Sequence, residues 1–519
     1  MMNTNMLILI VFAVYFSAII GLAIHFRKSK NLTDYYLAGR GLNTWVGALS
    51  AQTSDMSGWL LMGFPGAIFA AGVGRTWLAI GLIIGTILNW IFVARRLRRY
   101  TIVANNSITL PSYFENRFRD KSHVLKIVAA IFVAVFFTVY VASSFRAGGI
   151  LLYRLFGLTP IYGMMIVAAL IVAYTFIGGL TAISWTDTIQ GMMMLVALMA
   201  LPIIAVSMMG GWSNVVTELP DGFYNILSDG AGGRIATTSI ISDLAWGLGY
   251  FGMPHILIKL MAIKSDKMMK KSAVIGIVWV LLALGSALVV GLVGRAFLNS
   301  YVTEAGTRLI GVYPYGTGQE TVFIEMVRNI FLHPAAGLGF IIIGGLLLCG
   351  IFAAVKSTAD SQLLVASSAV TGDIYKQINK KATDKHLVWA SRFVVLVIAV
   401  LALVFVMFNE DGVMLLVAAA WAGFGAAFGP LVLLSIFWKR TNRAGGIAGV
   451  ITGGLTVLIW QYAPIIGGAT PGASTGLFSI VPGFALGFIA IIIGSLVTKK
   501  PSDEILVDFE TAKKPLIED

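Results

Sequence analysis

The sequence is short of charged residues, cysteine and histidine, and each shortage excludes a class of protein. Charged residues make up 12% of the 519 residues, whereas soluble globular proteins carry about 25%. The single cysteine, Cys349, excludes an internal disulfide and a cysteine metal cluster. The five histidines form no HExxH motif, and no convincing catalytic constellation is present. We therefore expect neither a soluble protein nor an enzyme.

Long apolar runs are abundant instead. Hydrophobic residues make up 58% of the chain, and the mean hydropathy is +0.87. A helix that crosses the ~30 Å hydrocarbon layer needs about 20 mostly apolar residues. The sequence therefore predicts an all-α integral membrane protein of about 13 transmembrane helices in a single membrane domain. The predicted spans are 6–26, 43–70, 75–94, 124–150, 160–178, 185–209, 237–260, 273–298, 335–372, 388–408, 413–437, 444–462 and 475–498.

Basic residues are distributed unevenly between the two sides of these spans. The loops after the odd-numbered spans hold most of the 37 Lys and Arg, including RRLRR at 95–99 and KSDKMMKK at 264–271. Because Lys and Arg are retained in the cytoplasm, we predict a multi-pass plasma-membrane protein with the N-terminus outside and the C-terminus cytoplasmic. The net charge of +13 then indicates anionic membrane lipid as a partner, not nucleic acid. No obligate protein partner is evident.

The sequence offers no ATP-binding motif to drive a pump. The segment CGIFAAVKST, 349–358, has Val355 where a phosphate-binding loop requires glycine, and no strand precedes it. Energy must then come from a gradient, unless the protein is a channel. A channel would need a repeated pore loop or a ring of like charges, and neither is visible.

Two predicted spans contain the residues of an interrupted helix. SAQTSDMSGWLLMGFPG, 50–66, and WGLGYFGMPHI, 246–256, lie five spans apart. Membrane helices break only where the freed backbone groups are buried or line a cavity. Paired breaks in successive five-helix units indicate a secondary transporter with inverted repeats. The alternative is that the glycines only allow close helix packing.

Asp55 lies beside the first predicted break, near the middle of the membrane. A carboxylate within the membrane is energetically costly and indicates function. It can organise a cation or meet a substrate's ammonium group, and the sequence leaves both roles open.

Five segments carry a resemblance to a known family over residues 5–500. The segments are LSAQTSDMSGWLLMG (49–63), YTFIGGLTAISWTDTIQ (174–190), WGLGYFGMPHI (246–256), STADSQLLVASSAVTGDIYK (357–376) and WAGFGAAFGP (421–430). They closely resemble the sodium:solute symporter family, and within it the members that carry proline. The resemblance implies a core of two inverted five-helix repeats, 43–209 and 237–437, with broken first and sixth core helices. A peripheral helix at 6–26, two at 444–498 and a cytoplasmic tail at 499–519 complete the expected organisation.

The resemblance also implies a site for sodium, the expected coupling ion. In the family this site lies between the first and eighth core helices, here between 53–56 and 354–358. The implied ligands are the main-chain carbonyls of Thr53, Met56 and Ala354 and the hydroxyls of Ser357 and Thr358. Consecutive hydroxyls lie about 100° apart on a helix and can flank one site. Without the resemblance, a bond to the preceding helical turn is the more ordinary role for such hydroxyls.

Proline requires an anion-binding corner, a partner for its ammonium and a flat apolar wall. Freed N–H groups around Ser57 and Gly58 suit the carboxylate, at the positive end of a half-helix, and Asp55 is the candidate for the ammonium. Tyr140, Trp246, Tyr250 and Pro254 match substrate-site positions of the family, and the aromatic rings suit ammonium contact. Met253 departs from the glutamine expected in proline carriers.

Three more charged residues are candidates for coupling. Asp187 is either a second cation site or a charge at a helix N-terminus. Lys356 replaces the apolar residue expected in the family, and Asp360 lies four residues on, within pairing distance on one helix face. The expected function is sodium-coupled proline uptake. The alternative is sodium-independent or proton-coupled transport of proline or a related solute, in which Lys356 replaces or alters the sodium site.

Overall fold

A computed structural model describes residues 4–27, 31–302, 318–333 and 337–515, with the backbone alone for 299–302. All regular elements in these ranges are helices. Eleven of the described helices are long and apolar enough to cross a membrane, as expected for an all-α membrane protein. Two of them begin at polar caps, where Thr383 and Asn442 accept hydrogen bonds from N–H groups in the first turn.

The count of eleven differs from the thirteen predicted spans because two spans are broken. The span predicted at 43–70 is interrupted, and its second half runs through a 3-10 turn, Gly72–Arg75, into the next helix. The span predicted at 237–260 is divided by a 3-10 stretch, Ala245–Phe251, into halves of eight and nine residues. Both interruptions lie where the sequence predicted them.

The two predicted five-helix units follow one another along the chain, separated by the short helix α11 (Trp212–Thr217). The first unit contains α3 (Thr44–Thr53), the π-helical Trp59–Gly63, α4 (Phe64–Ala71), α5 (Thr76–Leu88), the π-helical Asn89–Ala94, α6 (Arg95–Val103), α7 (Leu110–Phe118), α8 (Val124–Phe156), α9 (Pro160–Ile177) and α10 (Leu180–Met208). The second contains α12 (Thr237–Leu244), α13 (Pro254–Ala262), α14 (Asp266–Val302), α15 (Val322–Phe331), α16 (Leu338–Ser368), the π-helical Ala369–Tyr375, α17 (Lys376–Ile378), α18 (Asp384–Phe408) and α19 (Val413–Phe437). The first residues of the span predicted at 335–372 lie outside the described residues.

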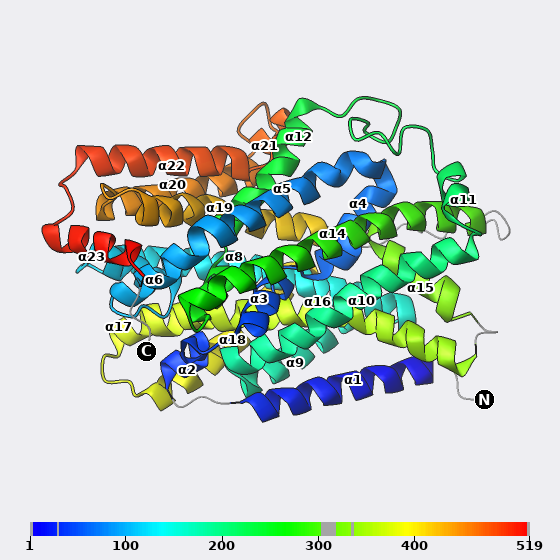
Figure 1. The fold of residues 1–519 in the computed structure, drawn as a ribbon, viewed down its shortest axis with the longest axis horizontal. Helices are drawn as coiled ribbons and strands as arrows, with labels where there is room; N and C mark the ends of the chain where they lie inside the picture. Colours follow the sequence, from blue (N-terminus) through cyan, green and yellow to red (C-terminus); the bar gives the residue numbers. More distant parts are fainter. Residues whose placement is uncertain (1–3, 28–30, 303–317, 334–336, 516–519) are drawn as a thin grey trace.

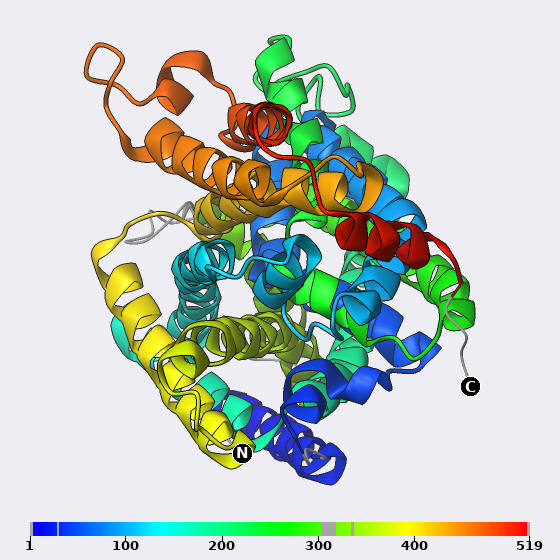
Figure 2. The same ribbon diagram turned by 90° about the vertical axis from the view of Figure 1, so that its left-hand side faces the viewer.

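The remaining helices cover the outside of this core. They are α1 (Thr4–Phe26), α2 (Leu32–Leu37), α20 (Arg443–Tyr462), α21 (Pro471–Thr475), α22 (Ile480–Val497) and α23 (Asp503–Lys513). Helix α1 packs on α10 and α16, whereas α20 and α22 pack on each other and on α19. Figures 1 and 2 show α1 and the α20–α22 pair on opposite sides of the bundle. Figure 1 also places α6, α17 and α23 at one end, and α11 and α15 at the other.

The prediction that RRLRR, 95–99, lies in a loop is wrong. These residues form the first turns of α6, which continues the preceding helix. The helix continues through this charged segment because its arginines are paired with a carboxylate. Arg98 and Arg99 both form ion pairs with Asp266 at the start of α14, so the basic cluster joins the two units.

The predicted tail contains a docked helix. Phe509 of α23 is buried and its ring lies 6.1 Å from that of Tyr100 in α6. The Arg117 guanidinium lies 5.4 Å from the centre of the Phe509 ring, and Arg119 forms an ion pair with Asp508 at 3.0 Å. Tail residues 516–519 lie outside the described residues. Helix α23 is therefore held to α6 and α7 by both apolar and charged contacts.

Replacing Phe509 by Ala is expected to release α23. Truncating a buried Phe to Ala costs about 3–5 kcal/mol, which raises the undocked fraction of α23 at least about hundredfold. Limited trypsin digestion of the purified protein should therefore remove the tail faster. Val507→Ala is the matched control, because Val507 in the same helix is 64% exposed. Equal cleavage rates in the two variants would contradict the docking.

Candidate functional site

The two helix breaks have different local causes. Helix α3 ends at Thr53, and the chain bends through Ser54 to Ser57 before helical geometry resumes at Gly58. At the second break, Met253 is extended, and Pro254 begins α13, where its missing N–H is not needed. Serines and aspartate compete with helical hydrogen bonds in the first break, whereas glycine and proline interrupt the second.

Asp55 is the centre of the contacts between the breaks. Its side chain is fully buried, and the Tyr250 hydroxyl donates to Oδ2 at 2.5 Å. The Tyr140 hydroxyl and the Trp59 indole N–H both donate to its main-chain oxygen at 3.3 Å. Oδ1 is buried and has no hydrogen-bond partner among the described residues. Asp55 therefore keeps acceptor capacity for a cation or an ammonium group.

The half-helices α3 and α13 lie side by side and are joined by side chains that the sequence analysis missed. The His255 Nε2 donates to the Ser54 carbonyl at 3.1 Å, and the Lys259 Nζ donates to the Ser50 carbonyl at 3.1 Å. From His255 to Lys259 the chain advances four residues along α13, while the partner carbonyl moves back four residues, from Ser54 to Ser50. The two half-helices therefore run antiparallel. The sequence did contain a signal for these side chains, because His255 and Lys259 lie four residues apart within the span predicted at 237–260 and therefore on one face of a helix.

Lys259 pairs with Asp187 in a polar cluster of four helices. Its Nζ lies 2.6 Å from Asp187 Oδ2 and 2.8 Å from the Ser361 hydroxyl. The Ser50 hydroxyl donates to the same carboxylate oxygen at 2.9 Å, and both charged side chains are fully buried. The alternative that Asp187 is a helix N-terminal charge is wrong, because it is the eighth residue of α10 and lies beyond the first turn.

The residues predicted to bind sodium lie at the contact between α3 and α16. The Ser357 hydroxyl lies 3.4 Å from the Thr53 carbonyl and 3.2 Å from the Ala354 carbonyl. The Thr358 hydroxyl is buried and has no hydrogen-bond partner in the described ranges. The Thr53 side chain faces away, since a Cβ on Gly191 of α10 would lie 2.1 Å from its hydroxyl. Oxygen atoms from the end of α3 and from α16 thus meet here, and the bond of Ser357 to Ala354 is the bond to the preceding turn that the sequence analysis gave as the alternative.

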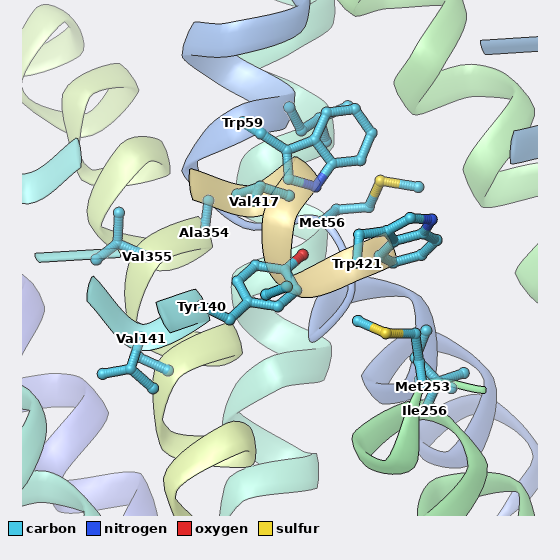
Figure 3. Packing of buried hydrophobic residues seen from close by; sticks show 14 of the residues in the cluster. Met56, Trp59, Tyr140, Val141, Met253, Ile256, Ala354, Val355, Val417 and Trp421 are labelled. Atoms are coloured by element: carbon cyan, nitrogen blue, oxygen red, sulfur yellow. The ribbon is translucent and has the colours of Figure 1, made fainter. Parts of the chain in front are cut away.

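Met56 lies just beyond this contact, toward Tyr140 and Trp421. Figure 3 shows Tyr140, Met56 and Trp421 pointing toward one another, with Ala354 of α16 on one flank and Met253 on the other. The Met56 side chain is fully buried.

Lys356 lies on a different face of α16 from Ser357. Its Nζ lies 2.7 Å from Asp360 Oδ2, so the predicted pair is confirmed. The same ammonium lies 3.4 Å from the Thr186 hydroxyl and 3.3 Å from Gln190 Oε1. It also lies 3.3 Å from the centre of the Tyr174 ring. Besides Asp360, the groups that contact the Lys356 ammonium therefore belong to α9 and α10, and none of these contacts is with α3.

The other predicted substrate residues are less closely gathered. Trp246 stacks on Phe478 with ring centroids 5.1 Å apart. Its main-chain carbonyl accepts a hydrogen bond from the Trp421 indole N–H at 2.7 Å. It also lines a pocket of about 410 Å³ at the end of the bundle opposite α23. The structure therefore places Trp246 one layer outside the Asp55–Tyr250 contact.

Ser57, Gly58 and Pro254 are buried parts of the two breaks. A Cβ on Gly58 would lie 2.6 Å from the Cβ of Ala147 in α8, so glycine also permits close packing there. The Ser57 hydroxyl has no hydrogen-bond partner among the described residues.

Comparisons with known proteins agree with this architecture. A model of the sodium:solute symporter family matches residues 35–453. The high-affinity proline transporter PutP of Bacillus subtilis is 42% identical over 489 residues, which cover 93% of this chain and 96% of the relative. The sodium/proline symporter of Escherichia coli is 42% identical over 496 residues, which cover 95% and 94%.

Solved structures show the same fold. A sodium-coupled sialic acid symporter in a substrate-bound outward-open state is similar with a TM-score of 0.76 at 19% identity, over 96% of this chain and 99% of that one. MhsT in complex with L-phenylalanine is similar with a TM-score of 0.52 at 14% identity, over 90% and 98%. Since the family model covers most of the chain and both relatives align over nearly their whole length, this chain belongs to the sodium:solute symporter family.

Proposed function

We propose that this chain is a secondary active transporter that couples inward movement of sodium to uptake of L-proline by alternating access. The observation that carries the proposal is the buried Asp55 at the first break, hydrogen-bonded to Tyr250 beside the second. In transporters with broken helices, substrate and ion sites lie near the middle of the membrane between the interrupted segments, and an ionisable residue there marks the path of an ion or substrate. The names of the two proline-carrying relatives support proline as the substrate.

The proposed proline site uses both breaks. The Asp55 carboxylate receives the ammonium, with Tyr140 and Tyr250 fixing its position through their hydroxyls. The main-chain N–H of Gly58 receives the proline carboxylate, whereas the N–H of Ser57, which the sequence analysis expected to be freed, donates to the Asp55 carbonyl at 3.0 Å. Trp246 forms the outer aromatic wall, and Pro254 fixes the second break. Met253 replaces an amide side chain next to this site, which favours a less polar wall.

The proposed sodium site consists of the carbonyls of Thr53, Met56 and Ala354 with the hydroxyls of Ser357 and Thr358. The contact of the Ser357 hydroxyl with the Thr53 carbonyl, across from α16 to α3, supports it. Sodium bound there would hold the end of α3 against α16 next to Asp55. The ion therefore favours the conformation that binds proline, which is the physical basis of coupling.

The coupling candidates outside this site are proposed to stabilise the packing of the helices and not to bind the transported ion. Lys356 satisfies Asp360, and Lys259 satisfies Asp187, so each carboxylate has a cation of its own. A buried charge is tolerated when it is paired and hydrogen-bonded. We do not propose that Lys356 replaces sodium, because its ammonium is directed to α9 and α10.

The proposed orientation places the end with α6 and α23 in the cytoplasm and the opposite end outside, across the plasma membrane. The basic residues of α6 and of the α13–α14 junction support it. The two five-helix units, 43–209 and 237–437, are proposed to be inverted repeats, and the antiparallel contact of α3 with α13 supports that relation. Membrane lipid and proline are the proposed partners.

Uptake of radiolabelled proline into proteoliposomes tests the function. We expect accumulation with an inward sodium gradient and none with an inward proton gradient or no gradient. Lys356→Met is expected to keep the sodium dependence, because the ammonium does not face Ser357. Accumulation without sodium in the parent, with sodium dependence appearing only in Lys356→Met, would show instead that the lysine replaces the ion. The absence of proline uptake under every gradient would reject the substrate.

A further inference from the structure

A second pocket lies at the α23 end of the bundle, and its lining includes no residue of either break. It has a volume of about 600 Å³ and lies where α1 and α9 end and α18 begins. Helix α9 contacts both α1 and α18, and Figure 2 shows the yellow α18 near the blue α1 at one edge of the bundle. Three helices of membrane length thus reach the membrane surface around this pocket.

Cations outnumber anions in the lining of the pocket. Arg27 follows α1, and Lys385 and Arg392 lie on the first turns of α18. A single carboxylate, that of Asp384, lines it as well, and it accepts a hydrogen bond from the Leu32 N–H at 3.4 Å. Three positive groups against one negative group leave the pocket with an excess of positive charge.

One buried donor inside the pocket is left without a partner. Tyr35 is 2% exposed, and its hydroxyl interacts with the Arg392 guanidinium. The buried Nε–H of Arg392 has no hydrogen-bond partner in the described part of the chain. Buried donors of this kind are normally satisfied, so this N–H points to a missing acceptor. A phosphate oxygen is an acceptor that guanidinium groups bind strongly.

The surface beside the pocket is apolar. Trp389 and Phe393 of α18 are 58% and 66% exposed, and the Arg392 guanidinium lies 4.7 Å from the centre of the Trp389 ring. Exposed tryptophan at the end of a span is typical of the membrane interface. A ligand in the pocket would therefore have acyl-chain surface next to its phosphate.

We propose that this pocket binds the headgroup of an anionic phospholipid. The phosphate accepts hydrogen bonds from Arg392 and Tyr35, Lys385 and Arg27 balance its charge, and the acyl chains lie along α18 beside Trp389 and Phe393. The site goes beyond general contact with lipid, because basic pockets between helices on the cytoplasmic side select particular headgroups. It is independent of the transport site.

Native mass spectrometry of the purified full-length protein tests this proposal. Phosphatidylglycerol and phosphatidylcholine with the same acyl chains are titrated separately, and inorganic phosphate is added as a competitor. We expect tighter binding of phosphatidylglycerol, unaffected by phosphate. In Lys385→Gln/Arg392→Gln, the affinity for phosphatidylglycerol should fall by about thirtyfold, since two interfacial charges are lost. Arg392→Lys keeps the charge and should retain most of the affinity, which also reports on folding.

The matched control is Lys376→Gln/Lys380→Gln, which removes two exposed cations at the same end, outside the pocket. This variant should bind phosphatidylglycerol like the parent. Equal losses in the two double variants would overturn the proposal in favour of diffuse surface charge. Equal affinity for the two lipids in the parent would also overturn it. Displacement of the lipid by inorganic phosphate would reject the lipid and identify a site for soluble anions.

Discussion

Replacing Asp55 by Asn is expected to lower sodium-driven proline uptake at least about thirtyfold. The substitution keeps the size of the side chain but removes the negative charge that lies within hydrogen-bond distance of the Tyr250 hydroxyl, between the breaks. Removing one member of a buried charged contact costs about 2–5 kcal/mol, and each 1.4 kcal/mol is a factor of about ten. Initial uptake rates in proteoliposomes under an inward sodium gradient measure the loss.

The protein should remain folded and inserted, because Asn can still accept from the Tyr250 hydroxyl. Asp221→Asn is the control, since Asp221 is exposed in a loop, and its uptake should equal that of the parent. Tyr250→Phe should give a smaller loss, about tenfold, because it removes one hydrogen bond to a charged group. Uptake by Asp55→Asn within a few-fold of the parent would contradict the proposed site.

Replacing Lys259 by Met is expected to destabilise the protein by about 3–5 kcal/mol, because it leaves the buried Asp187 charge without its cation. Asp187→Asn should have a comparable effect, since Lys259 is then the unpaired charge. The double variant should be much closer to the parent, because it contains neither buried charge. Thermal unfolding of the purified proteins, followed by tryptophan fluorescence, measures the three shifts.

The two single shifts and the double shift form a double-mutant cycle, in which failure to add reports the coupling of the pair. The pair Lys513–Glu510 on α23 provides the comparison, because both side chains are about half exposed. Lys513→Met should change the stability by less than about 1 kcal/mol. Additive shifts for Lys259→Met and Asp187→Asn would show that the buried pair does not hold α13 to α10.

The features that the sequence predicted correctly depend on short-range chemistry. The apolar runs predicted the membrane helices, and the glycines with Pro254 predicted the second break. The pair of Lys356 and Asp360 followed from their spacing on one helix. In each case the residues that interact lie within one turn or one span, where helical geometry alone fixes their relation.

The candidate site was predicted through a resemblance to a family, and its geometry was not accessible from the sequence. Asp187 and Lys259 are 72 residues apart, and no periodicity relates them. Lys259 was overlooked because it adjoins the basic cluster at 264–271, where a lysine is ordinary. Trp246 was grouped with Tyr250 because both match family positions, yet only Tyr250 contacts Asp55.

The sequence by itself determined that the chain crosses a membrane many times and where its helices break. Hydropathy, glycine and proline act through local backbone energetics, so these features need no knowledge of distant contacts. Only the tertiary structure decided which charge meets which partner, Asp55 with Tyr250 and Lys259 with Asp187. It also decided that α23 packs on α6. These contacts depend on how helices from separate parts of the chain pack, and buried charges select their partners only once that packing has removed them from water.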